Sequence, residues 1–246
     1  MKRKIDFEND DFLKSSWYYK LFSFFLYWFF AAPVLLVIKN IFLRVKIKGK
    51  ANYKKIKKHG GIIVCNHIHP FDAPMIAVSI IPTRMKIASL EQNFYTPIVG
   101  TLIKGLGALP VPKDLKYMKS SLNTFADLAK NGKKVLIFPE GHLIKYCPNM
   151  RVFKTGAFRA ALLAGVPIIP MCYTYPEGKR LTLNILPAVY PKLGEDHKEL
   201  TARVYNIMNA FFTQEMSQKS IKQLYEQEDE IRVEQIEDEF YTQRHA

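Results

Sequence analysis

Short runs of apolar residues alternate with longer segments of helical periodicity through the middle of the chain. One such segment has an apolar residue at every third or fourth position from Leu115 to Leu128, which is the pattern of an amphipathic helix. Asp114 precedes it as a candidate cap, and Asn131-Gly132 follows it as a stop signal. The predicted strands are Gly61 to Cys65, Met85 to Leu90, Leu109 to Val111, Val135 to Phe138, Ile168 to Tyr175 and Leu181 to Tyr190.

A second helix is predicted from Phe153 to Ala164, where Gly165 closes it. Alternation of strands and helices is typical of the α/β class, in which helices cover a mostly parallel sheet. We therefore expect a mostly parallel mixed sheet flanked by helices, with the strand at 181–190 as an antiparallel edge. A chain of 246 residues is long enough to bury such a core.

An apolar stretch near the N-terminus stands apart from this pattern. It runs for 18 residues without a charge from Leu21 to Ile38, and aromatic residues crowd its first half. As a helix it would be about 27 Å long, just short of the roughly 30 Å hydrocarbon core of a bilayer. Aromatic residues concentrate at bilayer interfaces, and Pro33 is expected to bend the segment. We predict a bent helical hairpin sunk into one membrane leaflet, with a buried core helix as the alternative.

A cleaved signal peptide is disfavoured, because the lead that precedes the apolar stretch contains four acidic residues. Basic residues follow the stretch, with nine Lys or Arg between Lys39 and Lys58. Such a cluster is expected to hold the next domain on the cytoplasmic face of the cell membrane and to draw its site onto anionic headgroups. The sequence thus divides into a membrane-association segment (1–50), an α/β domain (51–218) and an acidic tail that is helical or disordered (219–246).

The net charge of +14 is unevenly distributed. From Lys219 onward there are four basic and eight acidic residues, so residues 1–218 carry a net charge of +18. A basic body suits an anionic partner, either a nucleic acid or an acidic membrane surface. No nucleic-acid-binding signature is present, so membrane lipids are the expected partner.

Candidate chemistry follows the first predicted strand directly. The segment Asn66-His67-Ile68-His69-Pro70-Phe71-Asp72 sets an imidazole and a carboxylate five residues apart. A neutral imidazole takes up a proton near pH 7, and a carboxylate on its other ring nitrogen fixes the tautomer and stabilises the imidazolium. The alternatives are that Asp72 only caps the helix that follows and that His67 is an ordinary structural histidine.

A metal site is a further alternative, because His67 and His69 alternate along an extended segment that Asp72, Glu140 and His142 could join. The pattern resembles the His-x-His-x-Asp-His run of metallo-β-lactamase-like hydrolases. Asp72 stands five residues after the first histidine instead of four, and Ala73 occupies the position of another ligand. Since a metal needs three or four convergent ligands, none is expected.

Four blocks in order resemble the glycerolipid acyltransferases typified by bacterial 1-acylglycerol-3-phosphate acyltransferase. The blocks are Asn66-His67 through Asp72, Gly107 to Lys113, Phe138-Pro139-Glu140-Gly141 and Val166 to Pro170, and Phe153-Lys154-Thr155-Gly156-Ala157 matches the segment between the last two. The resemblance implies that His67 is a general base partnered by Asp72. It also implies that Glu140 and Gly141 contact the glycerol of the acceptor and that Lys113 meets its phosphate.

Two arginines of the family pattern are missing. Lys113 replaces one, and His142-Leu143 stands where the pattern has Thr or Ser followed by Arg. Lysine offers a point charge where arginine offers a planar fork, so phosphate recognition would be looser. Candidates to replace the lost charge are Lys145, Arg151 and Lys154.

The resemblance implies a membrane-associated acyltransferase of phospholipid biosynthesis. The acyl thioester, either acyl-CoA or acyl carrier protein, would be the cosubstrate, and no metal or prosthetic group is implied. The acceptor would be 1-acylglycerol-3-phosphate and the product phosphatidic acid. The remaining alternatives are another lysolipid acceptor, a metal-dependent hydrolase that uses His67, His69, Asp72 and His142, and a noncatalytic lipid-binding protein.

The three cysteines form no paired framework, which is typical of reduced thiols. Cys65 lies two residues before His67 and suggests a nucleophile that would carry an acyl-enzyme intermediate. A buried small hydrophobe on the strand is the favoured interpretation.

Overall fold

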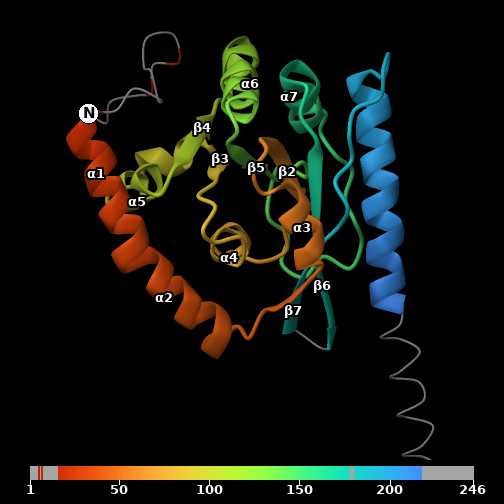
Figure 1. Ribbon diagram of the computed structural model, residues 1–246, viewed down its shortest axis with the longest axis horizontal. Helices are drawn as coiled ribbons and strands as arrows, with labels where there is room; N and C mark the ends of the chain where they lie inside the picture. Colours follow the sequence, from red (N-terminus) through yellow and green to blue (C-terminus); the bar gives the residue numbers. More distant parts are fainter. Residues whose placement is uncertain (1–4, 6, 8–15, 178–179, 218–246) are drawn as a thin grey trace, which may run out of the picture.

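A seven-stranded mixed sheet forms the centre of the described part of the molecule, in the order β1-β7-β6-β2-β5-β3-β4 (Figure 1). The computed structural model describes residues 5, 7, 16–177 and 180–217. The strands are β1 (Lys46–Lys48), β2 (Gly61–Cys65), β3 (Lys86–Leu90), β4 (Ala108–Val111), β5 (Lys134–Ile137), β6 (Ile168–Glu177) and β7 (Arg180–Ile185). All neighbouring strands are parallel except β6 and β7, which confirms the predicted α/β fold with a mostly parallel mixed sheet.

The prediction for the last strand is wrong in two respects. β7 ends at Ile185 and not at Tyr190, because Pro187 lacks the N–H that a ladder needs. Val189 then returns to exchange both backbone hydrogen bonds with Ile168. β7 is antiparallel to β6 as expected, but β1 pairs beyond it in parallel and forms the edge. Sequence patterning misses β1 because it is a three-residue strand with lysines at both ends.

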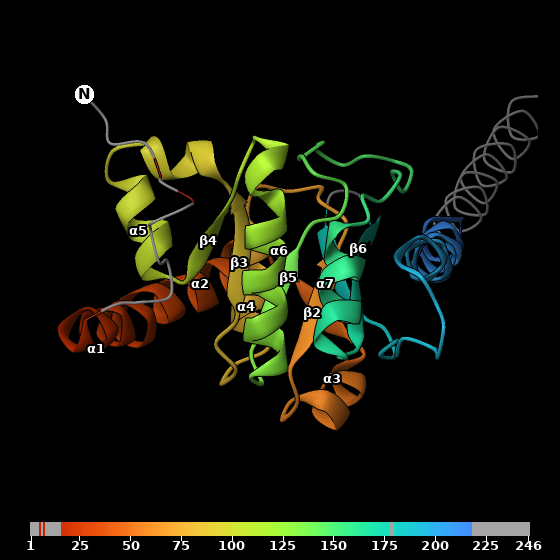
Figure 2. The same ribbon diagram turned by 90° about the horizontal axis from the view of Figure 1, so that it is seen from above.

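Helices cover both faces of the sheet. α6 (Leu115–Lys130) and α7 (Gly156–Ala164) lie on one face, and α4 (Asp72–Ser79) lies on the other (Figures 1 and 2). The remaining elements are α3 (Lys50–Ile56), a 3-10 helix (Glu91–Tyr95), α5 (Val99–Gly105) and a C-terminal helix at 197–217. The predicted acidic tail from Lys219 lies outside the described residues.

The helix prediction is confirmed for α6 and is wrong at the start of α7. α6 begins where expected, with the Asp114 carboxylate accepting the N–H of Lys116 at 2.9 Å, and it ends before Asn131. α7 begins at Gly156, three residues later than predicted, because the N–H of Lys154 is bonded to Pro139 O and Phe153 is buried in the core. Gly165 closes α7 in a left-handed conformation, as predicted.

The N-terminal apolar segment is one bent helix from Trp17 to Phe42, so the predicted hairpin is wrong. α1 (Trp17–Phe25) and α2 (Ala32–Val37) are joined by π-helical turns at Leu26–Ala31, and a second π-helical stretch follows at Ile38–Phe42. Pro33 lies at the junction between the π-helical turns and α2, the kind of place where helices bend, and the backbone around it stays right-handed helical. The segment therefore bends without reversing direction.

This helix is not a core helix, since only 17% of its most apolar window is buried. Its buried residues, Ser23, Tyr27, Ala32 and Lys39, face the rest of the molecule. Arg84 attaches the helix to the domain, because its guanidinium donates to Ser23 Oγ at 2.5 Å and Gly105 O at 2.9 Å and lies 4.9 Å from the centre of the Tyr27 ring. With 26 residues, the helix is long and apolar enough to cross a membrane.

The lysines of α3 lie at the end of the sheet where β2 begins, whereas His67 lies at the end where β2 stops. They precede β2, whose five residues extend about 17 Å before His67 is reached. Lys134, the first residue of β5, confirms this location, because its ammonium donates to Ile56 O at 2.8 Å and to His59 O. The expectation that the basic cluster draws the site onto headgroups stays a prediction.

Gly49 provides a test of how α3 is seated on the sheet. It has φ +76°, and a Cβ on it would lie 2.1 Å from Ile185 O at the end of β7. Gly194 has φ +78° with nothing within 4 Å of such a Cβ, so it is a matched control. Both Ala substitutions incur a backbone cost of about 1–2 kcal/mol.

Gly49→Ala should reduce the free energy of unfolding by roughly 1–3 kcal/mol more than Gly194→Ala, because only the former forces the backbone apart. Urea denaturation in detergent, followed by circular dichroism, measures the difference. Equal losses for the two variants would show that the chain around Gly49 relaxes freely.

Candidate active site

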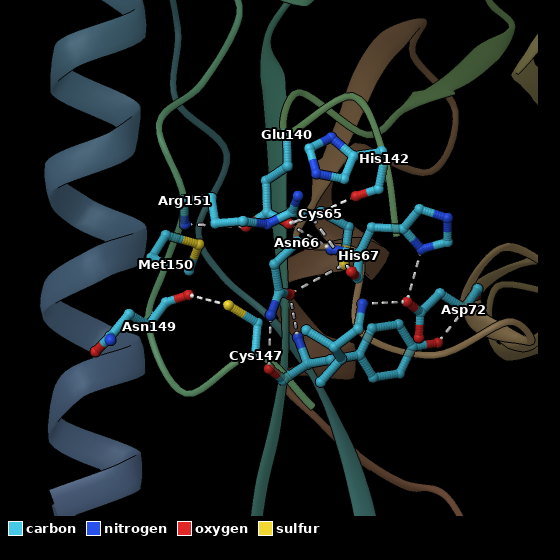
Figure 3. A network of polar contacts seen from close by, with 12 residues as sticks. Cys65, Asn66, His67, Asp72, Glu140, His142, Cys147, Asn149, Met150 and Arg151 are labelled. Atoms are coloured by element: carbon cyan, nitrogen blue, oxygen red, sulfur yellow. Dashed lines mark hydrogen bonds and ion pairs between the residues drawn. The ribbon is translucent and has the colours of Figure 1, made fainter. Parts of the chain in front are cut away.

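The candidate site lies where two neighbouring parallel strands end. β2 and β5 pair in parallel with Val64 opposite Ile137, so the residues that follow them meet at one edge of the sheet. His67 follows β2 and Glu140 follows β5 (Figure 3). The register therefore brings the polar clusters that follow the two strands together.

Asn66 determines where the chain leaves the sheet. Its side-chain amide accepts the N–H of Tyr173 at 2.8 Å and donates to the carbonyl of Tyr173 at 3.0 Å. The β2–β6 ladder ends one residue earlier, with Cys65 opposite Met171. Asn66 therefore satisfies the next backbone position of β6 with its side chain, and its own main chain is free to turn out toward His67.

The His67 imidazole is held on two sides. Its Nδ1 lies 2.9 Å from Asp72 Oδ2, and its ring stacks on Phe138 with centroids 4.0 Å apart and planes inclined by 15°. An ionised carboxylate only accepts hydrogen bonds, so in the neutral form of the ring the proton lies on Nδ1 and the lone pair on Nε2. Within the described part of the chain no group bonds Nε2, and the His67 side chain is 21% exposed while that of Asp72 is fully buried.

Asp72 organises the turn between β2 and α4. Its Oδ2 also accepts the N–H groups of Ile68 and His69, each at 2.8 Å. The helix-cap alternative is wrong, because Phe71 is the cap residue of α4 and the carboxylate bonds backward to the loop instead of forward to the helix. The carboxylate fixes the loop and the ring together.

Glu140 and Arg151 connect the exits of the two strands. Glu140 Oε2 accepts the N–H of His67 at 3.0 Å and the Arg151 Nη2 at 2.5 Å, and its Oε1 accepts the N–H of Arg151 at 3.2 Å. Arg151 Nη2 also donates to the carbonyls of His67, at 3.5 Å, and His142. The Glu140 carboxylate is thereby held inside the wall of the site, with its side chain 1% exposed.

The contacts with the acceptor that are expected of Gly141, Lys113, Lys145 and Lys154 stay predictions. The structure shows where these residues lie. Gly141 has φ +84°, and a Cβ on it would lie 2.8 Å from Lys154 Nζ, so the Lys154 ammonium lies over this turn. Lys113 is exposed after β4, at the same sheet edge as His67 but three strand spacings away, or about 14 Å from β2. Lys145 is exposed near His69.

His69 differs from His67 in its surroundings. Its Nδ1 accepts the N–H of Phe71 at 3.2 Å, and its ring lies beside those of Phe71 and Tyr146. Burial lowers the pKa of His69, the charge of Asp72 opposes that shift, and the charge of Lys145 adds to it. In the described residues no group of three or more His, Cys, Asp or Glu side chains converges as a metal site.

The buried thiol of Cys65 matches the favoured interpretation. Cys65 is fully buried on β2, and burial, followed by the charges of Asp72, Cys172 and Glu140, raises its pKa well above the usual value. A thiol that resists ionisation is a poor nucleophile.

Arg151→Met should lower the free energy of unfolding by about 3–5 kcal/mol, because it leaves the Glu140 carboxylate buried without its counter-ion. Glu140→Gln in the same chain removes that charge and should recover most of the loss. Arg159→Met, at an exposed position on α7, is the matched control and should change stability by less than about 0.5 kcal/mol. Equal stability of the Arg151 and Arg159 variants in chemical denaturation would contradict the role of the pair.

Comparisons with known proteins agree with this geometry. A family model described as Acyltransferase matches residues 44–174. The 1-acyl-sn-glycerol-3-phosphate acyltransferase of Escherichia coli (strain K12) is 29% identical over 163 residues, which cover 60% of this chain and 64% of the relative. The protein of the same name from Salmonella typhimurium is 31% identical over 129 residues, covering 51% of each chain. The chain thus spans about half to two thirds of the length of these curated relatives.

A solved structure supports the fold. The crystal structure of the 1-acyl-sn-glycerophosphate (LPA) acyltransferase, PlsC, from Thermotoga maritima superposes with a TM-score of 0.57. The match covers 80% of this chain and 94% of that chain at 18% sequence identity. At that identity the likeness establishes a shared architecture.

Proposed function

The chain belongs to the Acyltransferase family, and on this premise we propose that it transfers a fatty acyl group from an acyl thioester to the hydroxyl of a lysophospholipid. The observation that carries the proposal is the His67–Asp72 pair at the carboxyl edge of the sheet, with Nε2 of His67 unbonded within the described residues. A module that only binds lipid has no use for an imidazole whose tautomer is fixed by a buried carboxylate.

The proposed reaction needs no covalent enzyme intermediate. Nε2 of His67 takes the proton of the acceptor hydroxyl as its oxygen attacks the thioester carbonyl, and Asp72 stabilises the imidazolium that forms. The new C–O ester bond forms, the C–S bond breaks, and the imidazolium returns the proton to the departing thiolate. A hydroxyl is a poor nucleophile at pH 7, so positioning and base catalysis must act together.

For the acceptor we propose 1-acylglycerol-3-phosphate, which would yield phosphatidic acid. The names of the relatives support this choice. Nη2 of Arg151 is bonded to Glu140, and its Nε and Nη1 are buried, so the exposed ammonium groups of Lys113, Lys145 and Lys154 are the proposed phosphate contacts. The proposed donors are acyl-CoA and acyl carrier protein, which present the same thioester.

We further propose that the protein sits on the cytoplasmic face of the cell membrane with its N-terminal helix in one leaflet. The helix contacts the domain from Ser23 to Ile38, which is about 23 Å of its length. A helix that crossed the bilayer would pull the domain surfaces packed on it into the hydrocarbon. A helix lying along the interface exposes its apolar side chains to one leaflet without that cost.

The experiment that tests the proposed function gives the purified full-length protein both donors and a panel of phosphorylated and unphosphorylated lysolipids, with products identified by mass spectrometry. We expect phosphatidic acid as the main product. If only other lysolipids are acylated, the proposed acceptor is wrong although acyl transfer stands. Release of free fatty acid without any ester product would contradict acyl transfer.

In the same assay His67→Ala should lower kcat by at least about a hundredfold, because the general base is lost. Asp72→Asn should also impair turnover strongly. His69→Ala is the matched control and should stay within about threefold of the parent, since the contacts of the His69 ring among the described residues are to its own loop and to neighbouring aromatic rings. Comparable losses for His67→Ala and His69→Ala, together with inactivation by a chelator, would favour a metal-dependent hydrolase.

Lys113→Ala tests phosphate recognition. It should raise KM for 1-acylglycerol-3-phosphate by roughly tenfold, as expected for loss of one charge-assisted contact, while KM for the donor stays unchanged. Lys119→Ala, an exposed change on α6, is the control. An equal effect of Lys113→Ala on phosphorylated and unphosphorylated acceptors would show that Lys113 makes no phosphate contact.

A further inference from the structure

A second exposed apolar element lies beside the N-terminal helix. Ile98, Val99 and Leu102, in and just before α5, all expose their side chains, with Ile98 84% exposed. α5 lies next to α1 in both views (Figures 1 and 2). The contact is direct, since Ser23 donates to Gly105 O and a Cβ on Gly105 would lie 3.0 Å from Leu26 Cδ2.

The backbone at Ile98 holds this side chain outward. Ile98 has φ 65° and ψ −57°, and the N–H of Val99 donates to Pro97 O at 2.7 Å, which together define a classic γ-turn. This conformation is strained and rare for a β-branched residue. An exposed isoleucine at a strained turn has no role in the core, so its side chain is available to an apolar partner.

The position of α5 links the helix to the site. β3 ends at Leu90, at the same sheet edge as His67, and the chain from 91 to 105 runs from that edge to the surface against α1. The segment thus lies between the N-terminal helix and the edge of the sheet that carries His67. Its exposed cation, Lys104, suits anionic headgroups at the border of the apolar surface.

We propose that Ile98, Val99 and Leu102 form a second membrane-insertion element that enters the same phospholipid leaflet as the N-terminal helix. The lipid-facing surface then extends from the Trp17–Phe42 helix over α5 toward the edge of the sheet that carries His67. This rests on the proposed membrane-bound function and adds a residue-level contact to it. The occupant is a leaflet because the surface continues that of a helix whose apolar side chains are largely exposed along 26 residues.

Two kinds of variant test the proposal in full-length protein. Ile98→Gly removes the apolar side chain at a backbone conformation that glycine adopts easily, and a triple Ser variant at 98, 99 and 102 removes the whole element. Leu193→Ser is the matched control, because Leu193 is fully exposed in the loop before the 197–217 helix, at the opposite end of the sheet. Flotation with vesicles containing anionic phospholipid measures binding.

The triple variant should lose about tenfold or more in vesicle partitioning and Ile98→Gly a smaller part of that, while Leu193→Ser binds like the parent. Acyl transfer to detergent-dispersed acceptor should stay within about twofold for all of them. Unchanged vesicle binding of the triple variant would overturn the proposal. Because vesicle binding is measured without substrate, its result can be interpreted even if the protein shows no acyltransferase activity.

An environment-sensitive fluorophore on Ile98→Cys, in a Cys147→Ser background, reports insertion directly. Cys65 and Cys172 are buried and stay unlabelled. Emission should shift to the blue on adding vesicles for Ile98→Cys and not for Leu193→Cys. A blue shift that depends on protein concentration and not on vesicles would identify a second copy of the chain as the partner of this surface. It would overturn the proposal that the surface enters a leaflet.

Discussion

The site depends on one carboxylate oxygen. Oδ2 of Asp72 faces the Nδ1 of His67 and the N–H groups of Ile68 and His69, all within 2.9 Å. Because Asp72 is fully buried, these three donors replace the water that would otherwise solvate Oδ2, whereas Oδ1 is buried with no hydrogen-bond partner in the described residues. The same contacts fold the turn after β2 and fix the tautomer of the imidazole. Loop geometry and the protonation of the ring are therefore set by a single interaction.

The second buried carboxylate of the site, that of Glu140, connects two strands. Glu140 is compensated by Arg151 and receives the backbone N–H of His67, so it attaches the end of β2 to the end of β5. Asn66 attaches the same turn to β6 through Tyr173. Three neighbouring strands thus hold the segment from 66 to 72. The exposed ring edge of His67 is the part of this network left available to a substrate hydroxyl.

Much of this was predictable from the sequence. Strand runs, the periodicity of α6 and the five-residue spacing of His67 and Asp72 are local signals, and the fold and the pair follow from them. The bond between Arg151 and Glu140 was not predictable, because it depends on how the loop after Gly141 returns to the site. The N-terminal hairpin was wrongly predicted because proline-induced bending and chain reversal give the same pattern of residues, and packing against Arg84 decides between them.

The most direct test of the central interaction is the tautomer of His67. In ¹⁵N-histidine-labelled full-length protein in detergent, at a pH where the ring is neutral and with the signal assigned through His67→Gln, we expect the proton to reside on Nδ1 and Nε2 to be unprotonated. Asp72→Asn should abolish this preference. A proton on Nε2, or a ring that averages between tautomers equally in the parent and in Asp72→Asn, would contradict the view that Asp72 prepares His67 to act as a base.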